Sequence, residues 1–338
     1  MDKEDLEFLG SYFSNDKFSV HQLAQSGSER KNYVVNSEDK KFIYTTNENL
    51  RENESFFYFS KLFSDLDLNT PKVLGISSDR KRYLQSHLAE NTLSERLFTE
   101  GITPKNTTFL KKTLDLLFIF QEKTKGKVDI SKTFDYPEYG EIAIMHDLNY
   151  FKFMLVDMLE IPYHKYVLLN EFEAISKTIK ELGPKYLMIR DFQSRNILVN
   201  SDDDLFFIDY QAAMLGPAMY DVLSFLGQAR ANIPLALQEE LIQYYIQKFP
   251  YDQRDLLEQS IPWIRLIRAI QVLGAYGFRG LIQKKSHFSI SLEKGIENLV
   301  KITNSTSEII KEFPELKSIV DKLAEPRTKE KINTLISI

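Results

Sequence analysis

The feature that most constrains this chain is a change in its hydrophobic pattern near residue 106. Before that point, short segments typical of strands alternate with turns, and after it apolar residues recur at helical spacing over long stretches. The expected strands are residues 20–23, 33–35, 41–45, 71–76 and 82–88, with one helix over residues 52–63 between them. This change predicts an α+β protein with a small β-rich lobe and a larger helical lobe.

A single hairpin interrupts the helical part of the chain. Its two strands are residues 197–200 and 205–209, and the polar turn Ser-Asp-Asp-Asp joins them. The expected helices are residues 108–123, 149–159, 170–182, 217–227, 235–249 and 256–276. We therefore divide the chain into an N-terminal lobe (1–90), a C-terminal lobe (91–300) and a helical tail (301–338).

Composition excludes several classes of function. The net charge of −5 over 338 residues supplies no basic field for nucleic acid or anionic lipid. The absence of cysteine excludes disulfides, thiolate metal sites and cysteine nucleophiles, so a bound metal would have to use oxygen or histidine ligands. The acidic start of the chain lacks a secretion pattern, and the most apolar stretch, residues 261–281, contains three arginines. We expect a cytoplasmic protein with no membrane or nucleic-acid partner, and the oligomeric state stays open.

The residues that best indicate chemistry lie around the predicted hairpin. Asp191 is followed five residues later by Asn196, and Asp209 stands at the far end of the hairpin. Transfer of a phosphoryl group needs charge neutralisation on the phosphate oxygens and an acceptor hydroxyl held in line. Asn196 and Asp209 can supply oxygen ligands to Mg²⁺, and Asp191 can accept the hydroxyl proton. The pattern predicts a magnesium-dependent phosphotransferase.

The same residues resemble a known family. The segments RDFQSRN (190–196), IDYQ (208–211) and GPAMYDVLS (216–224) resemble the aminoglycoside phosphotransferase-like kinases, and most closely the bacterial cell-wall amino-sugar kinases. Residues 268–279 are also similar to that group. The resemblance implies a bilobal, protein-kinase-like fold and the use of ATP and Mg²⁺. It further implies that the acceptor is the anomeric hydroxyl of a small sugar such as N-acetylglucosamine or N-acetylmuramate.

Neutral amides and two arginines are the candidates for binding the acceptor. An acetamido sugar would be met by amides and aromatic faces, whereas an aminoglycoside with many ammonium groups would require Asp and Glu. The candidate substrate residues are Gln193, Arg195, Gln211, Gln271 and Arg279. Arg195 has an equally plausible structural interpretation, in which it pairs with Asp221 and stiffens the catalytic loop.

The nucleotide would bind to the first lobe. A loop between the first two strands places a glycine beside small and basic residues, which suits the close approach of phosphate. The candidate nucleotide-binding residues are Ser26, Gly27, Ser28, Arg30, Lys31, Glu54, Gln85 and His87. We expect Arg30 or Lys31 to pair with Glu54, and residues 85–88 to read adenine. The alternative for the loop is an ordinary surface hairpin.

Two departures from the family pattern keep other functions open. Ile189 occupies the place where the family usually has histidine, and residues 41–46 lack the usual third-strand lysine. These departures motivate a second hypothesis, a nucleotide-binding pseudokinase or scaffold, although Asp191, Asn196 and Asp209 argue against it. A third hypothesis is a kinase for another sugar or small alcohol, with a choline-like or aminoglycoside-like acceptor. A protein kinase is disfavoured because no D-F-G motif follows the hairpin.

Overall fold

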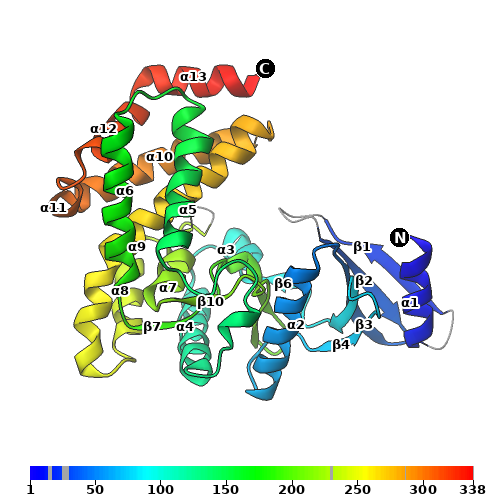
Figure 1. Cartoon of the computed structure of the whole chain (residues 1–338). Helices are drawn as coiled ribbons and strands as arrows, with labels where there is room; N and C mark the ends of the chain where they lie inside the picture. The colour runs from blue at the N-terminus through cyan, green and yellow to red at the C-terminus, as the bar shows by residue number, and fades with distance from the viewer. Residues whose placement is uncertain (14–16, 25–29, 229–230, 286, 338) are drawn as a thin grey trace. The chain divides into compact units, whose positions relative to one another are not determined.

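The computed structural model describes residues 1–13, 17–24, 30–228, 231–285 and 287–337. The chain forms two compact units (Figure 1). The first comprises Met1–Pro137, Leu187–Met214 and Arg230–Pro234, and the second comprises Glu138–Tyr186, Leu215–Ala229 and Leu235–Ile338. The chain passes between the units within two short strands, β7 (Lys185–Met188) and β10 (Met214–Pro217).

A five-stranded antiparallel sheet is the framework of the first unit, and its strand order is β1-β2-β3-β5-β4. Its elements are β1 (Phe18–Gln22), β2 (Lys31–Ser37), β3 (Lys40–Thr46), β4 (Val73–Ile76) and β5 (Arg82–Ser86), with α1 (Lys3–Phe13) before the sheet and α2 (Leu50–Asp65) between β3 and β4. Aromatic and β-branched side chains pair across the strands, with Tyr33 opposite Tyr44 and Val35 opposite Phe42. All the strands expected in this part of the sequence are confirmed.

Different helices cover the two faces of this sheet. Successive residues of a strand point to opposite faces, so the neighbours Tyr83 and Leu84 in β5 meet different helices. Tyr83 packs against Phe56 and Phe57 of α2, with ring centroids 5.0 and 5.2 Å apart. Leu84 instead belongs to a buried cluster with Leu9 of α1. Figure 1 shows α1 and α2 on opposite sides of the sheet.

A buried ion pair attaches α1, which the sequence pattern did not predict, to the sheet. The Asp5 side chain is 5% exposed, and its Oδ1 accepts hydrogen bonds from the Tyr44 hydroxyl at 2.7 Å and from Arg82 Nε at 2.9 Å. Arg82 also donates to Asp79 at 2.6 Å. The charge of Asp5 is therefore satisfied within the unit.

The predicted hairpin is confirmed, and it forms part of a smaller sheet in the first unit. β6 (Asn91–Thr92), β8 (Ile197–Val199) and β9 (Leu205–Phe207) lie in the order β6-β8-β9, and α3 (Leu93–Glu100) and α4 (Pro104–Thr124) follow β6 in the chain. Leu198 lies opposite Phe206 across the hairpin. The sequence pattern predicted that this strand ends at Asp209. In the structure β9 ends at Phe207, so Asp209 lies two residues beyond the strand.

The second unit is built from helices, and no described helix in the chain is long and apolar enough to cross a membrane. Its elements are α5 (Glu141–Phe151), the π-helix η2 (Lys152–Asp157), α6 (Lys165–Lys180), α7 (Met219–Leu226), α8 (Leu235–Ile246), α9 (Tyr251–Gly277), the π-helix η4 (Phe278–Ile282), α10 (His287–Ser305), α11 (Ser307–Ile310), α12 (Pro314–Leu323) and α13 (Pro326–Ser337). α9 and η2 approach so closely that a Cβ built on Gly277 would lie 2.3 Å from the Met154 carbonyl oxygen.

Three helices of this unit, α5, α6 and α9, begin earlier than predicted, and α5 shows the largest difference. α5 starts at Glu141 instead of residue 149, so Asp147 lies inside the helix. Asp147 resembles a helix cap in sequence, but its side chain is 2% exposed and accepts a hydrogen bond from the Tyr139 hydroxyl at 2.8 Å. Tertiary contact therefore satisfies a carboxylate that would otherwise mark a helix start.

Candidate active site

Asn196 joins the main chain of Asp191 to the carboxylate of Asp209, the two acidic residues that the sequence analysis singled out. It ends a short 3-10 turn, Ser194–Asn196, directly before β8, and it is 9% exposed. Its Nδ2 donates to the main-chain oxygen of Asp191 at 2.9 Å and to Oδ2 of Asp209 at 3.2 Å. The main-chain N–H of Ile208 donates to the carbonyl of Asn196 at 3.0 Å. The hairpin thus brings Asp191, Asn196 and Asp209 into one cluster.

Two residues of this region hold a left-handed backbone conformation. Arg190, which precedes Asp191, has φ +73°, and Asp209 has φ +65°. Such conformations are uncommon for residues other than glycine, and a strained one costs on the order of 1–3 kcal/mol. They persist only where the surrounding structure determines them, and they gather at functional sites. Their position on both sides of the cluster supports a functional role for it.

Arg30 places a buried positive charge against Asp209. Its Nη2 lies 2.5 Å from Asp209 Oδ1, its Nη1 donates to Gln211 Oε1 at 3.1 Å, and its Nε lies 3.4 Å from Glu52 Oε1. The Arg30 side chain is 13% exposed. Burial opposes its charge, but Asp209, Tyr83 and Glu52 outweigh this effect and raise the pKa of Arg30 above its ordinary value. The guanidinium is therefore a permanent cation at this carboxylate.

The structure corrects the expected partner of this basic residue. Glu54 does not contact Arg30; it forms a bidentate, solvent-exposed ion pair with Arg80. The carboxylate beside Arg30 belongs to Glu52, whose side chain is 14% exposed. The reason is helical geometry, since residues two apart on α2 point to different sides of the helix.

Two serines of α2 hold the segment that follows Asp209, and the sequence analysis missed both. The Ser55 hydroxyl donates to the main-chain oxygen of Gln211 at 2.7 Å, and the Ser60 hydroxyl lies 2.8 Å from the Tyr210 hydroxyl. The ring of Phe56 stacks on that of Tyr210, with centroids 5.3 Å apart. The available signal was the presence of serine inside an aromatic helical stripe, where a buried hydroxyl must find a partner.

Gln211 is engaged at both ends of its amide. Its Oε1 accepts from Arg30, and its Nε2 donates to Asp209 Oδ1 at 3.2 Å. The sequence analysis assigned Gln211 to the acceptor, but in this arrangement it holds Asp209 and Arg30 together. We therefore treat it as a positioning residue.

The other candidates for nucleotide binding are scattered. The predicted residues Ser26, Gly27 and Ser28 lie outside the described residues. Lys31 begins β2 and is exposed, and Gln85 donates to the Thr45 hydroxyl at 3.3 Å within the sheet. The His87 side chain follows β5 and is 12% exposed, and burial lowers its pKa. A neutral imidazole near the end of β5 is compatible with the adenine-reading role expected there.

The acceptor candidates fall in both units. In the first unit, Gln193 is half-buried and Arg195 is exposed. In the second unit, Gln271 accepts a hydrogen bond from Arg268 at 2.8 Å through its Oε1. The buried Arg268 also donates to the hydroxyls of Tyr220 and Ser224 at 3.0 and 2.8 Å.

Arg279 follows in η4 and is partly exposed. Its guanidinium carbon lies 5.5 Å from the ring centroid of Phe288, which is a cation–π contact. The positive charge of Arg279 is therefore held beside an aromatic face within the second unit.

The donor set around Asp209 fits Mg²⁺ that arrives with a nucleotide. Asp209 and Asn196 carry the hard oxygen donors that Mg²⁺ takes. Among the described residues, no three His, Cys, Asp or Glu side chains gather into a metal-binding group. Mg²⁺ is commonly held by one or two carboxylates, with phosphate and water completing its shell. In this structure Asp209 pairs with the guanidinium of Arg30, which shows that its carboxylate can bind a cation.

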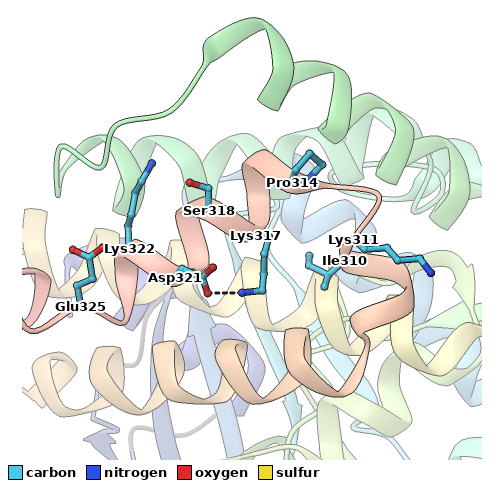
Figure 2. Close-up of a pocket in the computed structure, with 8 residues that line it drawn as sticks. All are labelled: Ile310, Lys311, Pro314, Lys317, Ser318, Asp321, Lys322 and Glu325. Atoms are coloured by element: carbon cyan, nitrogen blue, oxygen red, sulfur yellow. Dashed lines mark hydrogen bonds and ion pairs between the residues drawn. The ribbon is translucent and has the colours of Figure 1, made fainter.

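A pocket of about 460 Å³ in the second unit contains none of the predicted site residues (Figure 2). It lies along α11 and α12, and its lining includes three lysines whose ammonium groups have partners within the chain. Lys317 pairs with Asp321 at 2.5 Å, Lys322 donates to a carbonyl oxygen at 2.7 Å, and Lys311 pairs with Glu308. We assign no ligand to this pocket.

The fold is that of the aminoglycoside phosphotransferases and choline kinases. The choline kinase LicA from Streptococcus pneumoniae aligns with 88% of this chain and 100% of its own, with a TM-score of 0.61 and 15% identity. The spectinomycin phosphotransferase APH(9)-Ia aligns over 90% and 98% of the two chains, with a TM-score of 0.61 and 16% identity. An ethanolamine kinase from Plasmodium vivax aligns over 85% and 82%, with a TM-score of 0.59 and 12% identity. These structures confirm the predicted protein-kinase-like α+β fold.

A sequence model of the phosphotransferase enzyme family matches residues 156–257. The matched range contains Asp191, Asn196 and Asp209, which are the residues that the structure brings together. No curated protein sequence matches the chain. The match and the fold agree with the class of protein that the sequence pattern predicted, while the amino-sugar acceptor is a finer prediction.

Proposed function

We propose that this chain transfers the γ-phosphoryl group of ATP to a hydroxyl group of a small molecule. The observation that carries the proposal is the cluster in which Asn196 joins Asp191 to Asp209. Two further findings support it: the phosphotransferase family model covers these residues, and the fold is one that solved small-molecule kinases share.

Asp191 is the residue that receives a proton in this mechanism. It is half-buried, and the main-chain N–H of Asp191 donates to the Ile189 carbonyl at 3.0 Å, which fixes the loop in front of it. Its carboxylate accepts the proton of the acceptor hydroxyl as the new O–P bond forms and the bond to ADP breaks. Asn196 anchors the main chain of Asp191, so the carboxylate is presented from a rigid loop.

Asn196 and Asp209 are the residues that would hold Mg²⁺, and the ion when bound neutralises negative charge on the phosphates. Arg30 supplies the positive charge that the family usually takes from a lysine on the third strand, since residues 41–46 have no lysine at that place. Its charge is permanent, and its planar guanidinium can bind phosphate oxygens through two N–H groups. Glu52 of α2 contacts Nε of this guanidinium, and Gln211, two residues after Asp209, accepts a hydrogen bond from its Nη1.

For the acceptor we propose the anomeric hydroxyl of an N-acetylhexosamine. Gln193 and Gln271 are the amides assigned to the sugar. Two carboxylates of the first unit, Glu52 and Asp209, are already paired with Arg30, so they do not offer free negative charge to the ammonium groups of an aminoglycoside. The solved structures of similar fold include choline, ethanolamine and aminoglycoside kinases, and a choline-like acceptor is the alternative that the assay must separate.

A coupled assay of ADP release over an acceptor panel tests the proposal. The panel holds N-acetylglucosamine, N-acetylmuramate, choline, ethanolamine and gentamicin, with 1-deoxy-N-acetylglucosamine as the matched control. The hexosamines should react, and the 1-deoxy analogue should bind without reacting because a site that hydrogen-bonds a hydroxyl discriminates against its absence. Phosphorus NMR should show the product phosphate coupled to the C1 proton. Reaction with choline or gentamicin alone would refute the sugar assignment, and no transfer to any acceptor would refute the kinase assignment.

A further inference from the structure

The carboxylate assigned to Mg²⁺ is occupied by a side chain of the protein itself. Nη2 of Arg30 lies 2.5 Å from Oδ1 of Asp209, and Nε2 of Gln211 donates to the same oxygen at 3.2 Å. The other carboxylate oxygen, Oδ2, accepts from Asn196. Both oxygens of Asp209 therefore have hydrogen-bond donors, and one of these donors carries a full positive charge.

The contact between Arg30 and Asp209 is a strong one. The two side chains are 13% and 31% exposed, so water screens the pair only in part. Hydrogen bonds between charged groups are shorter and stronger than those between neutral groups. A second cation could not approach Oδ1 closely while the guanidinium stays there, because the two positive charges would repel each other.

The second carboxylate gives Arg30 a place to remain when it leaves Asp209. Nε of Arg30 lies 3.4 Å from Glu52, whose side chain is 14% exposed. This contact uses Nε, whereas the contacts to Asp209 and Gln211 use Nη2 and Nη1. Rotation of the guanidinium about the Nε end would release Asp209 while Glu52 still holds the side chain.

We propose that Arg30 and the divalent cation compete for Asp209, and that the nucleotide phosphates resolve this competition by taking over the Arg30 guanidinium. This inference rests on the proposed function. In the nucleotide-free chain, Arg30 keeps Asp209 neutralised and disfavours binding of the metal alone. Phosphate oxygens draw the guanidinium away, so nucleotide and metal bind with positive coupling.

Binding of Mn²⁺, measured by EPR with and without the nucleotide analogue AMP-PNP, tests the competition without any turnover. In Arg30→Gln, Asp209 loses its competing cation, so Mn²⁺ alone should bind at least about tenfold more tightly, since hydrogen bonds to charged groups contribute about tenfold or more to an equilibrium constant. AMP-PNP alone should bind more weakly. The factor by which AMP-PNP raises Mn²⁺ affinity should fall by about tenfold.

Lys61→Gln is the matched control, because it removes one positive charge from α2, the helix that carries Glu52, at a side chain that is 76% exposed. Its Mn²⁺ affinity should stay within about twofold of wild type, since exposed charges interact weakly. Arg30→Lys keeps the positive charge but lacks the planar guanidinium that contacts Glu52 and Asp209 at the same time. It should raise Mn²⁺ affinity by a smaller factor than Arg30→Gln does. This second variant keeps the test open if Arg30→Gln does not fold.

The possible outcomes distinguish a failure of this inference from a failure of the proposed phosphotransferase function. The proposed competition would be overturned if Arg30→Gln bound Mn²⁺ alone no more tightly than wild type does. The same result in Arg30→Lys would overturn it if only that variant folds. Arg30 would then be a residue that orders Asp209. An equal gain in Lys61→Gln would also overturn it, because general electrostatics would explain the change. If wild type binds no Mn²⁺ even with AMP-PNP, the proposed phosphotransferase function itself fails.

Discussion

Replacement of Ser55 by alanine tests whether α2 holds the segment that carries Asp209. Ser55 is 1% exposed, and its hydroxyl donates to the main-chain oxygen of Gln211, a residue that is 7% exposed, at 2.7 Å. The substitution removes one oxygen atom and leaves almost no cavity. It does leave a buried carbonyl without this donor, which costs about 1–3 kcal/mol.

Part of this loss is offset by the helix itself. Alanine is favoured over serine in a helix interior by about 0.5 kcal/mol, so the net loss of stability should be about 0.5–2.5 kcal/mol. Ser176 offers a matched control, because it is also 1% exposed inside a helix, α6, and its hydroxyl donates to the Glu173 carbonyl of the same helix at 2.9 Å. Ser176→Ala should be neutral or stabilise the protein by up to about 0.5 kcal/mol.

Urea denaturation of both variants measures these free energies, with the m-value confirming that the same surface is exposed on unfolding. Calorimetric titration with AMP-PNP and Mg²⁺ measures the site. Ser55→Ala should bind the metal–nucleotide complex several-fold more weakly, because Asp209 is no longer held in place, while Ser176→Ala should match wild type. Equal unfolding free energies in the two variants would refute the reasoning, since the bond to Gln211 would then contribute nothing.

Three further substitutions, one of them with a matched control, test the candidate site and the packing of the helices. Asp191→Asn should lower kcat by roughly two to four decades with little change in nucleotide affinity, as loss of a general base does; a collapse of nucleotide affinity with a high residual rate would contradict this role. Asp209→Ala should weaken binding of the Mg²⁺–ATP complex more than binding of free ATP, and equal weakening in calorimetry would count against its role as a metal ligand. Gly277→Ala should destabilise the protein by about 2 kcal/mol or more in thermal unfolding, because its Cβ would lie 2.3 Å from the Met154 carbonyl oxygen. Gly10→Ala in α1 is the control, since a Cβ there would have no atom within 4 Å, and it should stabilise the protein by up to about 1 kcal/mol.

The cluster of Asp191, Asn196 and Asp209 was predictable because it is local in sequence. Asp191, Asn196 and Asp209 lie around one hairpin, and hairpin pairing fixes which residues meet. The change from strand to helix patterns near residue 106 was also a local signal, and the fold that it predicts is confirmed. Periodicity and turn residues carry this information within a few residues of the element they specify.

The contacts of Arg30 and the position of α1 were not predictable in this way. Arg30 and Asp209 are 179 residues apart, and no spacing rule connects them. Asp5 lies in the acidic start of the chain, where no helix was predicted, and Arg82, 77 residues further along, pairs with its carboxylate. Buried ionic contacts between distant segments depend on the tertiary structure, so the sequence pattern of either segment alone gives no signal.

Once α2 is known to be a helix, its spacing predicts that Glu52, and not Glu54, is the carboxylate beside Arg30. The same spacing shows which residues of α2 support the site. Residues three or four apart on a helix lie on one face, and Glu52, Ser55, Phe56 and Ser60 follow that spacing. All four contact Arg30 or residues 210–211, so a single face of α2 holds both the cation and the segment that follows Asp209. A ligand that moves Arg30 therefore changes a contact of α2 at Glu52, one turn from the serine that holds Gln211. In the proposed mechanism, this arrangement gives a direct physical route from the nucleotide phosphates to the carboxylate that is assigned to the metal.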